Sequence, residues 1–276
     1  MADTAQSVAH SPTTTSDRGR LSIENVAVRY PGFTAIQDVS VEVPPGQFVA
    51  IVGPTGCGKS SLLNLVAGLQ SPAEGRVCSA GRPVGGVNRD CAYMFQQDAL
   101  LPWATALRNV QLGPVLRGTP RHVAAEAARG WLARVGLAGF EDRYPHQLSG
   151  GQRKRVAMAQ ALINRLPILL MDEPFSALDV QTRALMEQEL LGLWQEQRST
   201  VLFVTHDLEE AIALSDRVVL MTAGPAARLK GDYAVDLPRP RNVVEARFTP
   251  GFSEIYQRLW ADLREEVLGS YARQRA

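Results

Sequence analysis

The sequence predicts an α/β fold, and three short apolar runs lead to this interpretation. The run at residues 48–52 is followed at once by the pattern G-x-x-x-x-G-K-S over residues 53–60. The runs at residues 168–171 and 201–204 each end in polar side chains. Because ligands of open α/β sheets bind where parallel strands end, the three segments predict one shared site.

Residues 53–61 have the composition of a phosphate-binding loop. Their glycines let successive backbone N–H groups turn toward an anion, and the positive end of the following helix points to the same place. Lys59 adds a full positive charge, and Ser60 offers a hydroxyl to Mg2+, which prefers oxygen ligands. A loop kept only for its backbone geometry is the weaker alternative, because a strand pattern precedes it and a helix pattern follows it. The residues expected to contact a nucleotide here are Gly53, Pro54, Thr55, Gly56, Cys57, Gly58, Lys59, Ser60 and Ser61.

Length and composition narrow the function classes. The 276 residues, 45% of them hydrophobic, allow one large domain or two small ones. A formal charge of +1 gives no support for a nucleic-acid binder that acts through bulk electrostatics. The three cysteines have no metal-ligand spacing, and their odd number fits a reducing compartment. Among them, Cys57 is interpreted as a small loop filler rather than a nucleophile.

The chain shows no sign of crossing a membrane by itself. No apolar run approaches the roughly 18 residues that a membrane span needs, so any membrane role requires a partner. Residues 1–20 are rich in Ser, Thr and Ala and lack the apolar stretch of a secretory signal. We expect them to be a disordered tail, and the protein to be cytoplasmic.

Residues 21–43 alternate between apolar and polar positions and predict an antiparallel sheet ahead of the phosphate-binding loop. Val26, Val28 and Tyr30 share one face of the first strand. An aromatic ring at position 30 is able to stack on adenine. Strand aromatics pack into a core more often, so the sequence alone favours that alternative.

Residues 104–147 carry no strand pattern and predict a helical insertion. One helix is expected to begin with Thr119 as its N-cap and Pro120 in its first turn, and to stop at Gly136. The preceding segment, L-L-P-W at residues 100–103, is either core or an exposed docking patch.

Near the C-terminus, apolar residues four positions apart predict one more helix. Its apolar stripe would dock on the protein's own surface or on a second copy of the chain. The stripe consists of Ile255, Leu259, Leu263 and Val267.

Polar side chains that follow the apolar runs are candidates for chemistry. Asp172 can orient Mg2+ and its waters, while Glu173 can take a proton from a water that attacks a γ-phosphate. A plain helix entry is the alternative for this acidic pair. His206 is expected to bond a γ-phosphate oxygen or the attacking water. Gln96, after a short apolar run at residues 92–95, is equally well explained as a ligand contact or a solvated loop residue.

A second glycine-rich segment, Ser149, Gly150, Gly151 and Gln152, precedes a helix predicted over residues 153–164. Free N–H groups beside a hydroxyl suggest another anion site, and an ordinary helix cap is the alternative. The first loop already meets the phosphates of one nucleotide. The second segment therefore indicates a nucleotide held by a second copy of the protein.

In this order, the motifs resemble the nucleotide-binding subunit of ATP-binding cassette (ABC) transporters. They are GPTGCGKSS, Gln96, LSGGQ, LLMDEP, SALD and VTHD, preceded by Tyr30, and LSGGQ is the most specific. The resemblance implies a P-loop NTPase core of the RecA-like type within residues 21–240. It also implies an N-terminal antiparallel β subdomain, an inserted helical subdomain at about residues 97–160 and a C-terminal helical tail at residues 241–276.

The resemblance also implies ATP and Mg2+ as cofactors and a role for each motif residue. Tyr30 would stack on adenine, and Gln96 would sense Mg2+ and the γ-phosphate. Glu173 would be the general base and His206 the switch residue, beside Lys59 in the catalytic set. Ser60, Gln96 and Asp172 would hold the metal, and residues 149–152 would close on ATP bound to the opposite subunit.

Two segments, LLPW and VDLPRPR at residues 235–241, resemble the nitrate, sulfonate and taurine importer group. This implies a homodimeric ATPase that drives a transmembrane permease as a peripheral subunit on the cytoplasmic face of the cell membrane. A substrate-binding protein outside the membrane would choose the cargo, and no nucleic acid is expected as a partner. With 70 residues after His206, the long regulatory domain of maltose-type importers has no room.

Thr55 and Ser61 stand where many members of the family have Ser and Thr respectively, which should leave the loop intact. The alternative function is a soluble, non-transport ABC ATPase acting on nucleic acid or ribosomes. Such proteins tend to carry two cassettes or a long coiled coil, whereas this chain has one phosphate loop, one LSGGQ and no sustained heptads.

Overall fold

A six-stranded sheet forms the centre of the molecule, in the order β10-β9-β3-β8-β7-β6. The computed structural model describes residues 17–275. All neighbouring strands of this sheet run parallel except β9 and β10, which are antiparallel. The strands are β3 (Phe48–Val52), β6 (Cys91–Met94), β7 (Ile168–Asp172), β8 (Thr200–Val204), β9 (Arg217–Met221) and β10 (Leu229–Ala234).

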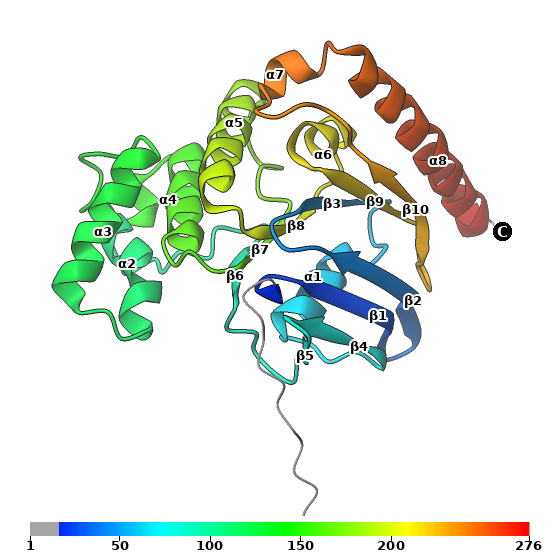
Figure 1. The fold of residues 1–276 in the computed structure, drawn as a ribbon, viewed down its shortest axis with the longest axis horizontal. Helices are drawn as coiled ribbons and strands as arrows, with labels where there is room; N and C mark the ends of the chain where they lie inside the picture. The colour runs from blue at the N-terminus through cyan, green and yellow to red at the C-terminus, as the bar shows by residue number, and fades with distance from the viewer. Residues whose placement is uncertain (1–16, 276) are drawn as a thin grey trace, which may run out of the picture.

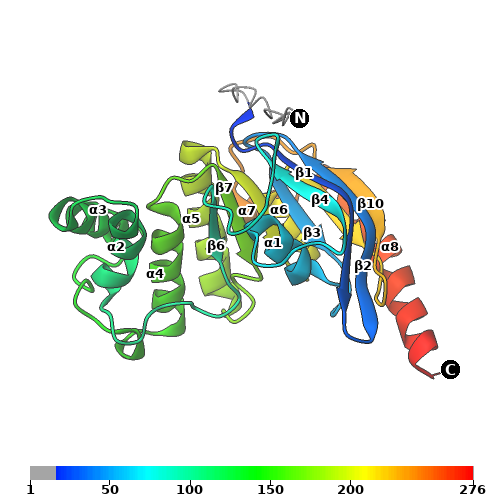
Figure 2. The same cartoon turned by 90° about the horizontal axis from the view of Figure 1, so that it is seen from below.

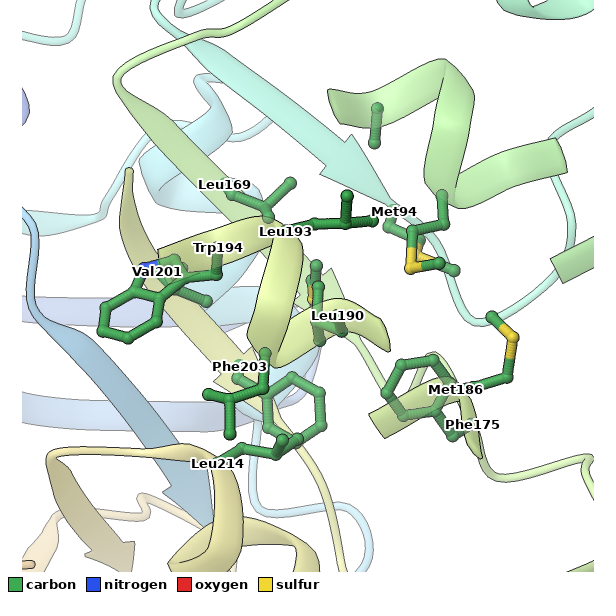
Figure 3. Packing of buried hydrophobic residues seen from close by; sticks show 14 of the residues in the cluster. Met94, Leu169, Phe175, Met186, Leu190, Leu193, Trp194, Val201, Phe203 and Leu214 are labelled. Carbon is green, nitrogen blue, oxygen red and sulfur yellow. The ribbon is translucent and has the colours of Figure 1, made fainter. Parts of the chain in front are cut away.

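The inner strands are apolar except at their ends because both faces of the sheet are covered. Phe48 and Ala50 of β3 point into one core, and Val49 and Ile51 point into the other. The first core lies against α4 (Gly150–Leu162), α5 (Val180–Gln197) and α6 (Leu208–Leu214), and Figure 3 shows Trp194 of α5 packed within it. The second core lies against α1 (Lys59–Ala67).

A separate antiparallel sheet closes the second core, with the order β2-β1-β4-β5. Its hairpin pairs Leu21 with Val43 at one end and Tyr30 with Phe33 at the other. The predicted antiparallel sheet is therefore confirmed, and α1 lies between it and the central sheet (Figure 2). Its strands are β1 (Leu21–Tyr30), β2 (Phe33–Val43), β4 (Glu74–Ser79) and β5 (Arg82–Pro83).

A lobe of helices projects from one side of the central sheet (Figure 1). It contains α2 (Ala106–Leu116), α3 (Arg121–Arg134), a 3-10 turn (Pro145–Gln147) and α4. The sequence did not predict α2, because the glycine and proline at positions 113 and 114 interrupt its helical pattern.

The start of α3 also differs from the prediction. Pro120, not Thr119, is its N-cap, so the helix begins one residue later than predicted, at Arg121. Thr105 instead caps α2 and accepts a hydrogen bond from the Arg108 backbone N–H at 3.3 Å.

Part of the segment expected to be a disordered tail has defined contacts. Residues 1–16 lie outside the described residues. Residues 17–20 form a turn in which Arg20 pairs with Asp17 at 3.1 Å and with Glu42 of β2 at 2.5 Å. The prediction of disorder does not hold for these four residues.

The C-terminal segment forms α7 (Val243–Ala246) and the long α8 (Pro250–Arg275), which runs along α6 and β10 (Figure 1). Leu259 is fully buried, and Ile255 and Leu263 pack against the same core. Of the two predicted alternatives, the stripe therefore docks on the protein's own surface. Among residues 17–275, no helix combines the length and apolar character needed to cross a membrane.

Candidate functional site

Four neighbouring strands, β3, β8, β7 and β6, end at one edge of the central sheet and place the predicted polar residues there. The phosphate loop follows β3, Glu173 follows β7 directly, and Gln96 and His206 each lie two residues past their strands. These segments enclose a pocket of about 560 Å³. It is lined by Tyr30, Phe33, Ala35, Thr55, Gly56, Gly58, Lys59, Ser60, Ser61, Gln96, Glu173 and His206.

The phosphate loop presents free backbone donors to this pocket. Gly58 caps α1 in the left-handed conformation (φ +93°) and supplies no side-chain cap, so the first N–H groups of the helix are left for a ligand. A Cβ atom at position 58 would lie 2.7 Å from Cγ1 of Ile36, so only glycine fits. Lys59 Nζ donates to the carbonyls of Gly53 (2.9 Å) and Pro54 (3.2 Å), which holds the ammonium at the centre of the loop.

Cys57 takes no part in the pocket surface. Its side chain is fully buried in the core beneath β1 and β2, and burial raises the pKa of the thiol. A thiol that resists ionisation is a poor nucleophile. The structure therefore supports the interpretation of Cys57 as a loop filler.

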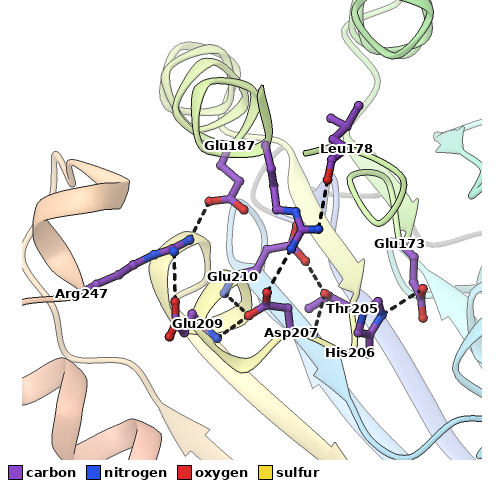
Figure 4. Close-up of polar contacts among 10 residues, drawn as sticks. Glu173, Leu178, Glu187, Thr205, His206, Asp207, Glu209, Glu210 and Arg247 are labelled. Atoms are coloured by element: carbon purple, nitrogen blue, oxygen red, sulfur yellow. Dashed lines mark hydrogen bonds and ion pairs between the residues drawn. The ribbon is translucent and has the colours of Figure 1, made fainter. Parts of the chain in front are cut away.

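Glu173 joins three strand ends through one carboxylate oxygen. Its Oε2 lies 3.1 Å from Nδ1 of His206 and accepts a hydrogen bond from Nε2 of Gln96 at 3.3 Å (Figure 4 shows the His206 contact). The backbone of Glu173 has φ +44°, a conformation that few non-glycine residues adopt and that clusters at functional sites. Its N–H donates to the Val204 carbonyl of β8 at 2.9 Å, which fixes the turn.

Asp172 is the last residue of β7 and is 8% exposed. Burial raises the pKa of its carboxyl group, while a hydrogen bond with the Ser60 side chain opposes that shift. A nearby cation would favour the ionised form. Ser60 and Asp172 offer hard oxygen atoms, which suit Mg2+.

No group of three His, Cys, Asp or Glu residues able to hold a metal occurs within residues 17–275. A divalent ion at Ser60 and Asp172 would therefore need further oxygens from a phosphate group and from water. Mg2+ in phosphate-binding sites is usually held this way, so the donor set fits that ion.

Tyr30 stands at the mouth of the pocket and is 36% exposed, so the core alternative for this residue is wrong. Its hydroxyl lies 3.0 Å from Ser61 Oγ and donates to Gln70 Oε1 at 3.1 Å. Its ring stacks on Phe33, with centroids 5.3 Å apart and planes at 22°. The sequence analysis missed Phe33, although its place opposite Tyr30 follows from the hairpin register.

Residues 149–152 lie outside the pocket of their own chain. Ser149 is the N-cap of α4, which starts at Gly150 rather than at the predicted residue 153. Its hydroxyl accepts from the Gln152 N–H (3.3 Å), and Gln152 Oε1 accepts from the Ser149 N–H (2.9 Å). The two hydrogen bonds of a helix cap are therefore present, and this segment lies apart from the pocket that the phosphate loop lines.

Lys154 connects α4 to the segment that carries Gln96, a link the sequence did not reveal. The lysine is 3% exposed, donates to the Gln96 carbonyl at 2.7 Å and pairs with Asp98 at 3.0 Å. Arg153 also contacts Asp98, at 3.2 Å. In the sequence, a lysine in a helix ordinarily indicates an exposed face, so nothing marked this one as buried.

A polar network behind His206 was also missed (Figure 4). Arg183 of α5 donates to the Leu178 carbonyl at 3.2 Å and to Asp207 at 3.3 Å, so it joins the segment after Glu173 to the segment after β8. The Thr205 hydroxyl donates to Glu210, whose N–H donates to Asp207 at 3.2 Å. These bonds fix the backbone on both sides of His206.

Two carboxyl groups of this network are buried. Glu210 is 4% exposed, and burial raises its pKa to about 8. Glu187 is fully buried, and burial raises its pKa to about 7 although Arg247 pairs with it at 3.2 Å. Burial therefore favours the protonated form of Glu210.

The fold and the pocket define a nucleotide-hydrolysing cassette, and solved structures agree. The chain is similar to a dimeric structure of a post-hydrolysis state of an ATP-binding cassette bound to ADP and Pi. That match has a TM-score of 0.70 and 31% identity, and covers 79% of this chain and 100% of that one. A dimeric structure of a bacterial ABC transporter cassette matches with a TM-score of 0.71 and 32% identity over the same shares.

Sequence relatives give the family. An uncharacterized ABC transporter ATP-binding protein of Methanocaldococcus jannaschii is 46% identical over 86% of each chain. A taurine import ATP-binding protein of Chromobacterium violaceum is 50% identical over 76% of this chain and 81% of its own. An aliphatic sulfonates import ATP-binding protein of Pectobacterium atrosepticum is 43% identical over 92% of each. The family model for ABC transporters matches residues 36–176, and the chain belongs to this family.

Replacing Glu210 by Gln should change how stability depends on pH. The pKa of Glu210 is raised from 4.5 to about 8 on folding, so the native state holds a proton that the unfolded state releases in this range. Its contribution to stability is complete below pH 4.5 and is lost as the pH rises toward 8. Glu210→Gln should make the slope of unfolding free energy against pH less negative, by up to about 1.4 kcal/mol per pH unit.

Urea unfolding at pH 5, 6.5 and 8 measures this slope. The matched control is Glu254→Gln, which changes an exposed glutamate of α8 and should leave the slope unchanged. Equal slopes for the wild type and Glu210→Gln would contradict a proton on Glu210.

Proposed function

We propose that this chain is the ATP-hydrolysing subunit of an ABC import system for a small anionic or organic solute. The observation that carries the proposal is the pocket, which brings the phosphate loop, Glu173 and His206 together. The names of the relatives, which include taurine and aliphatic sulfonate import proteins, support the direction of transport and the class of cargo. The nitrate import ATP-binding protein of Synechococcus elongatus, 41% identical over 88% of this chain and 36% of its own length, supports an extension of that class to inorganic anions.

Glu173 acts as the general base in this proposal. The attacking water gives a proton to the carboxylate while its oxygen bonds the γ-phosphorus, and the bond from that phosphorus to the bridging oxygen breaks and releases ADP. His206 and Gln96 hold Oε2 of Glu173 at 3.1 and 3.3 Å, so both side chains set the direction of the base. Lys59, at the centre of the loop, offsets the negative charge of the phosphates.

Ser60, Asp172 and Gln96 are the residues proposed to hold Mg2+, which would neutralise phosphate charge when bound. The buried carboxyl of Asp172 lies within hydrogen-bond reach of Ser60, so two oxygen ligands are already adjacent. Tyr30 is proposed as the adenine platform, because its ring is exposed at the mouth of the pocket.

Two copies of the chain would complete each nucleotide site. Residues 149–152 would close on ATP held by the phosphate loop of the second copy, with free N–H groups of α4 directed at the phosphates. The exclusion of these residues from the pocket of their own chain supports this arrangement, as do the dimeric states of the two similar structures. ATP would favour the closed dimer, and hydrolysis would release it.

A groove of about 800 Å³ beside Gln97 is the proposed permease docking site. Phe95 lines one side of it, and Leu112 and Leu116 of α2 line the other. Leu116 is 77% exposed, and Trp103, at 72%, lines an adjoining pocket that shares Leu112 with the groove. Such exposure is unusual for large apolar side chains. Held there, the subunit would be peripheral on the cytoplasmic face of the membrane, and an extracytoplasmic substrate-binding protein would select the cargo.

Glu173→Gln should retain ATP binding and lose turnover by about 10²- to 10⁴-fold, because the amide cannot accept the proton. The ATP-bound dimer should accumulate. Phosphate release and size-exclusion chromatography with MgATP measure both effects, with Glu254→Gln as the control. Near-normal hydrolysis would remove Glu173 from the role of base.

Mixing two inactive variants should restore activity if the sites are shared between copies. Lys59→Ala damages the phosphate loop and Ser149→Ala damages the opposite surface, so each mixed dimer keeps one complete site. Random mixing makes half of the dimers mixed, and about a quarter of wild-type activity should return. Mixtures as inactive as the separate variants would contradict a shared site.

Trp103→Ala should weaken retention by the co-expressed cognate permease at least tenfold and leave the ATPase rate of the free subunit unchanged. Affinity capture of the detergent-solubilised permease measures retention. Trp260→Ala is the matched control, because Trp260 is also exposed, at 50%, and lies on α8 away from the groove. Equal retention of both variants would exclude Trp103 from the docking surface.

A further inference from the structure

A second pocket lies where β7 and β8 begin, at the opposite ends of these strands from Glu173 and His206. It has a volume of about 490 Å³, and four arginines line it together with a single carboxylate. We call it the arginine pocket and define it by Arg18, Arg134, Arg165, Arg198 and Glu196.

Most of the positive charge in the arginine pocket is uncompensated. Glu196 pairs with Arg134 at 2.5 Å. Within the part of the chain that the structure describes, Arg18, Arg165 and Arg198 form no ion pair, and all three are exposed. Three guanidinium groups around one cavity repel one another, and a bound anion would remove that repulsion.

Unusual backbone conformations or close backbone approaches occur at or beside each of these three arginines. Arg165 follows α4 with φ +46°, and Arg198 ends α5 with φ +53°, both in the region that non-glycine residues rarely adopt. Gly19 lies so near the start of β8 that a Cβ atom there would be 2.8 Å from Thr200 Oγ1. This close approach brings Arg18 to the same cavity.

Two arginines, one of them from the pocket, also lie over the same buried aromatic ring. Arg198 and Arg239 lie over the ring of Trp194, with guanidinium carbons 5.2 and 4.4 Å from its centroid. Burial lowers the pKa of Arg239; its ion pair with Asp216, at 2.7 Å, opposes that shift, and the charge of Arg198 adds to it. The Trp194 ring is 1% exposed and therefore offers no free surface for a nucleotide base.

We propose that the arginine pocket binds a small free oxyanion of the sulfate or phosphate type. Guanidinium groups present paired N–H donors that match two oxygens of such an ion, and several converge here. The absence of an aromatic platform in the pocket disfavours a nucleotide. The net charge of +1 for the whole chain disfavours a long polyanion, which would need an extended basic surface.

Calorimetry with sulfate at constant ionic strength tests the proposal. Saturating MgADP is present throughout to fill the phosphate loop, and only the sulfate binding that the pocket variants weaken is assigned to the arginine pocket. The wild type should bind one sulfate per chain, and Arg165→Gln with Arg198→Gln should bind at least tenfold more weakly. The control replaces Arg129 and Arg264, two exposed arginines of α3 and α8, by Gln and should match the wild type.

Two further measurements keep the test decisive. MgADP affinity and the unfolding temperature in chloride check that each variant is folded. If the double variant does not fold, Arg18→Gln alone should still weaken sulfate binding several-fold.

Three results would overturn the proposal. They are no saturable sulfate binding by the wild type, equal affinity in the pocket and control variants, or pocket-dependent binding of anionic lipid vesicles or RNA without binding of sulfate.

Discussion

Side chains from three strand ends of the central sheet meet at one oxygen atom, Oε2 of Glu173. It contacts His206 after β8 and Gln96 after β6, while its own backbone is tied to β8 through Val204. This convergence requires three adjacent parallel strands in register, and the buried side chains on both faces of the sheet enforce that register. The polar network of Arg183 and Asp207 then braces the same strand ends from behind.

The sequence predicted the residues at the edge of the sheet because each has a strong local signal. Gly53 to Ser61 follow a phosphate-loop pattern, Glu173 directly follows β7, and His206 lies two residues past β8. The antiparallel sheet was also predicted, since apolar and polar residues alternate along its strands, a pattern that is typical of strands with one buried face. A local pattern was therefore sufficient for prediction where one continuous segment forms both the strand and the polar loop that follows it.

What escaped prediction depends on partners distant in the chain. Lys154 is a charged helix residue whose hydrogen-bond partner, Gln96, lies 58 positions away, so its burial could not be predicted from its own helix. Phe33 joins Tyr30 through strand pairing, and α2 was hidden by a glycine and a proline that its packing against α3 and α4 tolerates. Tertiary context overrides propensity in each of these places.

The buried Lys154 fixes α4 to a segment that precedes it in the chain by more than 50 residues. The helix is capped by Ser149, on the surface proposed to face a second copy. In its second turn, Lys154 donates a hydrogen bond to the Gln96 carbonyl and forms an ion pair with Asp98. Lys154 and Asp98 are largely shielded from water, so dissolved salt screens this ion pair little. Lys154 therefore couples the start of α4 to the segment of Gln96 and Asp98, which adjoins the groove lined by Gln97.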